Sequence, residues 1–208
     1  RVLRAAERAG VARVVMTSSS RAAHLVSDSG IVIDERCWSD PRSRSLDAYS
    51  RAKILAERSA WEFMQGVRSG MTLATVLPSL VQGPLFGPLR SPSLAVTALL
   101  LQGGLRRIPP LGFNIVDVRD LADLHLRALF DPAAAGQRFV GTGGFLWMRE
   151  IAALLRGRFP QQADAVPTRM APAAMMGVEM LVNAELRRLL PRLRVRRDYT
   201  AAKAERLL

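Results

Sequence analysis

Apolar residues recur at helical spacing in two segments of the first part of the chain. The first segment predicts a helix over residues 2–10 that ends at Gly10. The second predicts a helix over residues 47–64, for which Asp47 is a suitable N-terminal cap. The buried face of this second helix is expected to consist of apolar residues, namely Ala52, Leu55, Ala56, Ala60 and Phe63.

Short runs of β-branched and aliphatic residues between the helices predict strands. One strand covers residues 13–17, and another covers residues 73–77 and is closed by Pro78. The polar stretch over residues 21–46 predicts a loop. In the second half, the same patterns predict helices over 93–101, 119–130, 148–157 and 173–190 and strands over 115–118 and 137–141. Because strands and helices alternate, we expect an α/β fold with a parallel sheet and right-handed crossovers.

The composition narrows the class of protein. A chain of 208 residues with 49% hydrophobic content can bury a core. Its single cysteine, Cys37, excludes an internal disulfide, and without a neighbouring histidine it is interpreted as structural. The sequence shows neither a signal peptide nor an apolar run of ~20 residues, so we expect a cytoplasmic protein without a membrane partner.

The net charge of +12 raises the alternative of a nucleic-acid-binding protein. The arginines are scattered from Arg1 to Arg206, however, and are dense only between Arg187 and Arg197. Only 6% of the residues are aromatic, whereas surfaces that bind nucleic acid usually carry aromatic side chains on which bases stack. We therefore interpret the basic excess as a bias of composition and expect no nucleic acid partner.

The pair Tyr49 and Lys53, preceded by the serine run 18–20, is the strongest candidate for chemistry. Residues four apart on a helix lie on one face, one turn from each other. An ammonium group close to a phenol favours the phenolate, so that such a phenol can act as a general acid or base near neutral pH. The serines follow the predicted strand over 13–17, and parallel sheets bind ligands at the carboxyl ends of their strands. The alternative is that the serines only satisfy backbone groups in a turn.

This combination resembles the extended short-chain dehydrogenase/reductase superfamily, also described as the NAD-dependent epimerase/dehydratase family. The similarity is greatest to its branch of dihydroflavonol, cinnamoyl-CoA and aldehyde reductases, and it extends over residues 3–160. Besides the serines and the Tyr49/Lys53 pair, it rests on four segments in matching order, namely residues 34–40, 77–84, 116–120 together with His125, and 138–143.

The resemblance implies a catalytic role for three residues. Tyr49 would give a proton to the substrate oxygen while a nicotinamide delivers hydride to the carbonyl carbon. Lys53 would bind the nicotinamide ribose and favour the phenolate of Tyr49, so that both residues also belong to the cofactor site. Ser19 would polarise the carbonyl group, with Ser18 as the alternative.

Four further residues have weaker implied roles. Pro78 and Val81 match a segment that lines the nicotinamide, although a strand terminator and a core residue would look the same. His24 matches a position that contacts the substrate in plant members. His125 is interpreted as a packed structural histidine, and no grouping of residues has the spacing of metal ligands.

The resemblance also implies an architecture, the C-terminal part of a Rossmann-type parallel sheet with a smaller mixed α/β substrate lobe. Residues 1–83 correspond to the second half of the cofactor domain. Residues 84–208 correspond to the substrate lobe, with residues 113–145 returning to the sheet. The glycine-rich turn that opens the family's cofactor domain has no counterpart in the sequence, so we expect the first half of that domain to be missing.

The implied function is the reduction of an aldehyde or ketone, a small carbonyl substrate, with NADP favoured over NAD, or the remnant of such an enzyme. One alternative is a nucleotide-sugar epimerase or dehydratase, which uses the same serine, tyrosine and lysine. Another is a non-catalytic α/β fragment that needs a partner chain. A homodimer, or a partner that supplies the missing strands, is a further expectation, because the sheet would otherwise expose an edge.

Overall fold

The computed structural model describes residues 1–24, 31–87, 91–172 and 193–208. The helix expected over residues 173–190 lies outside these ranges. Among the helices of the described ranges, none combines the length and the hydrophobicity that a membrane span requires.

The chain divides into two compact units that alternate along the sequence. The first consists of Arg1–Gly83, Ile115–Gly144 and Asp198–Leu208, and the second consists of Pro84–Asn114 and Phe145–Arg197. This division differs from the expected one at the C-terminus, because Asp198–Leu208 belongs to the first unit and not to the lobe that begins at residue 84.

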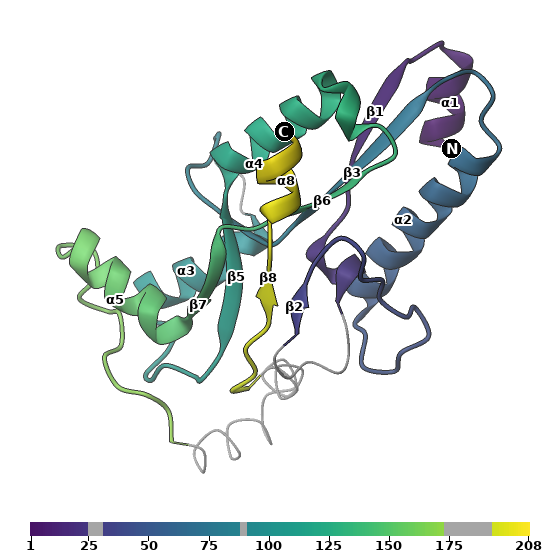
Figure 1. The fold of residues 1–208 in the computed structure, drawn as a ribbon. Helices are drawn as coiled ribbons and strands as arrows, with labels where there is room; N and C mark the ends of the chain where they lie inside the picture. The colour runs from purple at the N-terminus through teal and green to yellow at the C-terminus, as the bar shows by residue number, and fades with distance from the viewer. Residues whose placement is uncertain (25–30, 88–90, 173–192) are drawn as a thin grey trace. The chain divides into compact units, whose positions relative to one another are not determined.

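The first unit is built on a three-stranded parallel sheet with the order β1-β3-β6 (Figure 1). The central strand, β3 (Thr72–Pro78), pairs with β1 (Arg13–Thr17) on one side and with β6 (Arg138–Gly141) on the other. All residues of β3 after Thr72 are buried, which is typical of a parallel strand covered on both faces. The strands predicted over 13–17, 73–77 and 137–141 are therefore confirmed.

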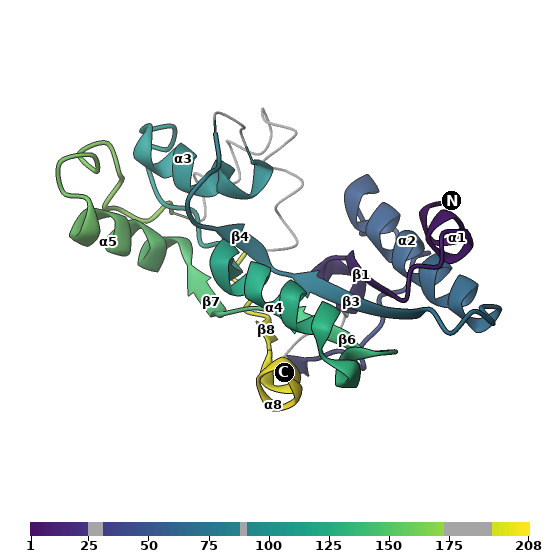
Figure 2. The ribbon, with the colours of Figure 1, turned by 90° about the horizontal axis from the view of Figure 1, so that it is seen from above.

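One face of this sheet is covered by α4 (Val118–Phe130) and α8 (Ala202–Leu207), with η3 (Pro132–Ala134) after α4. Figure 2 shows these helices on the side of the sheet away from α2. Val76 and Phe139 are fully buried in the cluster that the sheet forms with α4 and α8. Fully burying an apolar side chain of this size stabilises the fold by about 1.5–3 kcal/mol.

The opposite face is covered by α2 (Ala48–Gln65), by the turn η1 (Ser20–Ala23) and by β2 (Val32–Ile33). Ile54, Leu77 and Val140 are fully buried in this second cluster. β2 pairs in parallel with β8 (Asp198–Tyr199), so the end of the chain is fixed to the first unit.

The helix α2 begins as expected, because the Asp47 carboxylate accepts a hydrogen bond from the N–H of Ser50 at 2.6 Å. Of its expected buried face only Ala60 is buried; Ala52, Leu55 and Ala56 are exposed, with Leu55 at 48%. The face of α2 that packs against the sheet includes the polar residues Ser50 and Glu57. A prediction of the buried face from apolar residues alone therefore selects a different side of the helix. The buried residues of α2 are Ser50, Ile54, Glu57 and Ala60.

The second unit contains the turn η2 (Pro92–Leu94) and the helices α3 (Ala95–Leu101) and α5 (Met148–Arg158). The helices predicted over 93–101 and 148–157 are thus found, the first with a 3₁₀ turn at its start. The rings of Phe145 and Trp147 meet edge to face at 4.9 Å between centroids, a favourable aromatic geometry.

The remaining elements are short. β4 (Leu80–Gln82), β5 (Gly112–Asp117) and β7 (Gly144–Trp147) form a sheet in the order β4-β5-β7. The helix α1 (Val2–Arg8) precedes β1 and ends before Gly10, near the predicted stop. β5 confirms the strand predicted over 115–118, whereas β4 and β7 contain too few residues to show a periodic pattern.

Candidate active site

The serine run begins where β1 ends. Ser18 continues the sheet for one residue, because its N–H donates to the carbonyl oxygen of Val76 at 2.7 Å. Ser19 turns the chain into η1, where its Oγ accepts a hydrogen bond from the N–H of Arg21 at 3.2 Å. The two serines are only 2% and 6% exposed. The Ser19 hydroxyl thus satisfies a turn, and as a hydroxyl it can still donate its own hydrogen.

The helix α2 carries Tyr49 and Lys53 one turn apart, in its first two turns. Lys53 is half-buried, and its Nζ donates to the carbonyl oxygen of Thr17 at 3.1 Å. Tyr49 is 59% exposed. The structure therefore places the ammonium group of Lys53 at the strand end that leads to Ser19, with Tyr49 one turn earlier on the same helix.

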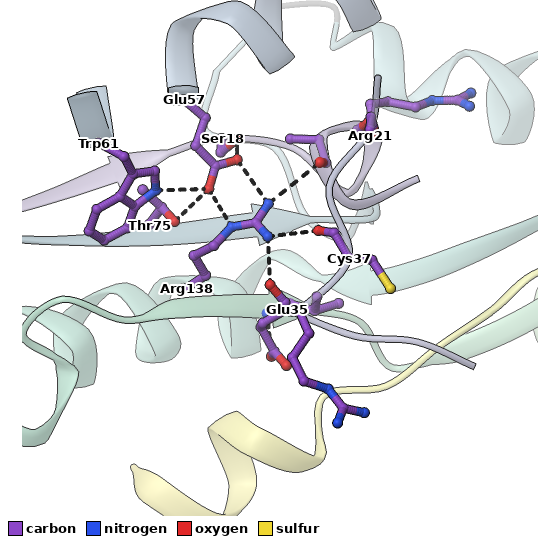
Figure 3. A network of polar contacts seen from close by, with 12 residues as sticks. Ser18, Arg21, Glu35, Cys37, Glu57, Trp61, Thr75 and Arg138 are labelled. Carbon is purple, nitrogen blue, oxygen red and sulfur yellow. Dashed lines mark hydrogen bonds and ion pairs between the residues drawn. The ribbon is translucent and has the colours of Figure 1, made fainter. Parts of the chain in front are cut away.

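A buried network of polar contacts lies next to this strand end (Figure 3). The Glu57 carboxylate accepts hydrogen bonds from Ser18 Oγ at 2.6 Å, from Thr75 Oγ1 at 2.8 Å and from Arg138 Nε at 2.8 Å. Trp61 Nε1 adds a longer contact at 3.4 Å. The opposed charges and the three short bonds together satisfy a carboxylate that has no exposure to solvent.

Arg138 extends the network to the segment that follows β2. Its Nη1 donates to the carbonyl oxygens of Glu35 at 2.6 Å and Cys37 at 2.8 Å. Its guanidinium carbon lies 3.6 Å from the centroid of the Trp38 ring, a cation–π contact. The Glu35 carboxylate in turn accepts the N–H of Val140 at 2.9 Å.

Sequence reasoning singled out neither Glu57 nor Arg138 as a site residue. Arg138 entered only as part of a segment that resembles the family. A signal for Glu57 does exist: it lies four residues after Lys53, so that Tyr49, Lys53 and Glu57 share one side of the predicted helix. A charged residue on the side that bears the candidate chemistry was a reason to search for a buried partner.

Pro78 and Val81 lie at and after the carboxyl end of β3. Pro78 is the last residue of that strand and pairs with Gly141 of β6. Val81 is the middle residue of β4, is half-buried and pairs with Val116. Between them, the buried Oγ of Ser79 has no hydrogen-bond partner within the described part of the chain.

The two histidines both make contacts within the first unit. His24 Nδ1 lies 3.1 Å from the hydroxyl oxygen of Tyr199. His125 Nδ1 lies 2.7 Å from the carbonyl oxygen of Leu121, and its Nε2 lies 2.9 Å from Thr17 Oγ1. A donor is required at Nδ1 of His125 because its partner only accepts, so Nε2 accepts from the Thr17 hydroxyl. This half-buried, bonded ring has the geometry of a structural histidine.

Asp117 caps α4 and forms an ion pair with Arg119. The hydrogen bonds from the side chain and the backbone N–H of Arg119 lower the pKa of Asp117 to about 2. This pair lies at the junction of β5 and α4, where Asp117 ends the strand and Val118 begins the helix. Within the described ranges, no group of three or more histidine, cysteine, aspartate or glutamate side chains is arranged to hold a metal ion.

The sheet, its covering helices and the strand-end serines define an α/β protein of the Rossmann type. The model of the NAD dependent epimerase/dehydratase family matches residues 1–140, and the chain belongs to this family.

The sequence is similar to several reductases. It is 35% identical to a cinnamoyl-CoA reductase of Oryza sativa over 77% of this chain and 48% of the relative. It is 32% identical to a dihydroflavonol 4-reductase of Zea mays over 77% of this chain and 46% of the relative. The chain thus spans about half the length of the curated relatives that it matches.

The fold is also similar to solved structures. Yeast methylglyoxal/isovaleraldehyde reductase, determined in complex with NADPH, matches 99% of this chain and 61% of its own chain with a TM-score of 0.74 and 23% identity. Vestitone reductase from alfalfa matches 99% of this chain and 62% of its own with a TM-score of 0.74 and 22% identity. At these identities the likeness concerns the fold.

Proposed function

We propose that this chain carries the proton-transfer site of an NAD(P)H-dependent reductase of aldehydes or ketones, with NADPH as the favoured cofactor. The observation that carries the proposal is the 3.1 Å contact between Lys53 Nζ and the carbonyl oxygen of Thr17, which joins the helix of Tyr49 to the strand end before Ser19. Relatives named as reductases support reduction over the other reactions of the family.

The residues at the strand ends fit a nicotinamide nucleotide. Lys53 offers an ammonium group, and the buried Ser79 Oγ lacks a partner within the described part of the chain. Apolar surface for a ring is available from Pro78 and Val81, as the family resemblance implies. The bound nucleotide would supply the hydride. Lys53 would hold its ribose hydroxyls, and Pro78 and Val81 would line the nicotinamide.

The chain's own residues would then manage the carbonyl oxygen. Ser19 would donate a hydrogen bond to this oxygen and stabilise the negative charge that develops on it. Tyr49 would transfer its phenolic proton to the same oxygen, so that the product is an alcohol. The charge left on the Tyr49 oxygen would be stabilised by the ammonium group of Lys53.

The proposal is tested with the whole gene product, by fluorescence titration with NADPH and NADH and by following NADPH oxidation on a panel of aldehydes and ketones. The chain has two lysines, Lys53 and Lys203, which provide a matched pair of variants. Lys53→Met is expected to weaken NADPH binding and turnover at least tenfold, whereas Lys203→Met is expected to stay within about twofold.

Either of two results would overturn the proposal. One is a folded gene product that binds neither nucleotide, and the other is equal behaviour of the two lysine variants. Conversion of a nucleotide sugar without net consumption of NADPH would instead indicate an epimerase or dehydratase.

A further inference from the structure

The strand end and the catalytic helix are joined by two adjacent contacts. Lys53 Nζ donates to the carbonyl oxygen of Thr17 at 3.1 Å, and one residue later Ser18 Oγ donates to Glu57 Oε2 at 2.6 Å. Thr17 and Ser18 are consecutive at the end of β1, and their partners Lys53 and Glu57 are one turn apart on α2. The two contacts therefore lie next to each other. Each contact has one ionised partner, but the Ser18–Glu57 contact is shorter and buried, so it is the stronger of the two.

Glu57 is itself held in one orientation. Arg138 Nε donates to Oε1 at 2.8 Å, and Arg138 Nη2 lies 3.4 Å from Oε2. Nη1 of the same guanidinium group donates to the backbone carbonyl oxygens of residues 35 and 37, and the Trp38 ring lies against the group. Both side chains of the pair are buried, at 0% and 8% exposure. Rotation of the carboxylate would leave a buried charge without a partner, which is costly.

The site residues depend on this arrangement through the backbone. Ser19 directly follows Ser18, and Tyr49 and Lys53 precede Glu57 by two turns and one turn of the same helix. A shift of Ser18 relative to Glu57 therefore changes the separation between Ser19 and the Tyr49/Lys53 pair. Displacement of reacting groups by about 1 Å can reduce turnover by as much as 100-fold.

We propose that Glu57 is a positioning residue of this site: through its bond to Ser18 it fixes the strand end that bears Ser19 against the helix that bears Tyr49 and Lys53. The inference rests on the proposed function for its catalytic consequence. Its structural part, the coupling of Ser18 to Lys53, does not depend on the reaction.

Two hydroxyl groups donate to the same carboxylate, and they provide a matched test. Ser18 lies beside Ser19, whereas Thr75 lies in the middle of β3, where it pairs with Met16 and Arg138. Ser18→Ala and Thr75→Val each remove one buried hydroxyl from Glu57. Both are expected to lower stability to a similar extent, since each lost hydrogen bond is of the same kind.

The first readout is steady-state kinetics of the whole gene product. Ser18→Ala is expected to lower kcat about tenfold or more with little change in KM, because ground-state binding is kept and the geometry of the transition state is lost. Thr75→Val is expected to keep kcat within about twofold. Equal loss of kcat in both variants, or loss in neither, would overturn the proposal.

The second readout needs no activity. In the protein labelled with ¹³C at lysine Cε, the side-chain signal of Lys53 is assigned by its loss in the Lys53→Arg variant. The Lys53 signal is expected to shift in Ser18→Ala, because the contact of Lys53 with Thr17 loses its neighbour, and to stay in place in Thr75→Val. An unmoved Lys53 signal in Ser18→Ala would refute the coupling even if the gene product reduced no carbonyl compound. In that case the proposed function would fail separately.

Discussion

Glu57 and Arg138 form an ion pair of two buried side chains, with 2.8 Å between Nε and Oε1. Removing two charges from water costs several kcal/mol each, and their attraction together with further hydrogen bonds must offset that cost. Here the carboxylate has Ser18 and Thr75 as additional donors, and the guanidinium group has carbonyl oxygens as acceptors. The intact pair therefore adds little net free energy of unfolding, whereas removal of one partner lowers the free energy of unfolding strongly.

Replacement of Glu57 by glutamine is expected to lower the free energy of unfolding at pH 7 by about 3 kcal/mol, because it leaves the Arg138 charge buried without a counter-charge. Burial raises the pKa of Glu57, but the hydrogen bond and charge of Arg138 and the bonds from Ser18 and Thr75 lower it below its usual 4.5. Folding thus favours the ionised form. Its contribution is complete above pH 4.5 and is lost as the pH falls through the folded-state pKa.

Urea unfolding at a series of pH values from 7 to well below 4.5 measures both effects. The Glu57→Gln variant is expected to lose less stability than the wild type as the pH falls below 4.5. The control is Glu62→Gln, an exposed position on the same helix, where a change within about 0.5 kcal/mol is expected. A Glu57→Gln variant as stable as this control would contradict the account of the buried pair.

The candidate site could be read only in part from single residues. Tyr49, Lys53 and the serine run carry a recognisable spacing because Tyr49 and Lys53 lie one turn apart on one helix and the serines follow the end of one strand. The Glu57–Arg138 pair joins residues 81 positions apart, and no local pattern connects them. Nothing in the local sequence distinguishes Arg138 from the many other arginines. It is buried because β6 lies next to β3 in the folded sheet, and this neighbour could not be predicted from the sequence.

At the level of elements, the longest patterns were the most informative. β1, β3, α4 and α5 were predicted within two residues at each end, because each helix has several turns and each strand is a continuous run of mostly apolar residues. β2, β8 and β4 have two or three residues each, and they form only because a neighbouring strand supplies hydrogen bonds. Partners that are distant in the sequence leave no periodic signal.

Gly83 directly follows β4 and is the last residue of the first stretch of the first unit. Its φ is +131°, and a Cβ at this position would lie 2.8 Å from Val118 Cγ1, at the start of α4. Gly83→Ala is expected to lower the free energy of unfolding by about 3 kcal/mol, since backbone strain and overpacking add.

Gly136 is the matched control for this substitution. Its φ is +73°, but a Cβ there meets nothing within 4 Å. Gly136→Ala therefore measures the cost of the backbone conformation alone, about 1 kcal/mol. Thermal or urea unfolding of the two variants separates the cost of the backbone conformation from the cost of the contact with Val118. An equal loss of unfolding free energy in both variants would contradict a steric clash between Val118 and a side chain at residue 83.

At the scale of the whole molecule, the candidate catalytic residues all belong to the first unit, which is assembled from three separate stretches of the sequence. Within the described strands, β1 and β6 each pair with β3 alone, so neither edge of the sheet has a partner strand there. Such an edge exposes backbone groups that can pair with another strand. The family members that this chain matches are about twice as long as the matched region, so the reaction is best tested on the whole gene product.

The most direct test of the central claim is the transfer of deuterium to a carbonyl compound from NADPH in which both hydrogens at the nicotinamide C4 are replaced by deuterium. The account predicts an alcohol with one deuterium on the former carbonyl carbon. It also predicts that Tyr49→Phe, with an unchanged circular dichroism spectrum, lowers the rate at least 100-fold, as expected for loss of a general acid. An unlabelled alcohol, no alcohol, or a Tyr49→Phe variant with the wild-type rate would contradict the assignment of Tyr49 as the proton donor in a nicotinamide-dependent reduction.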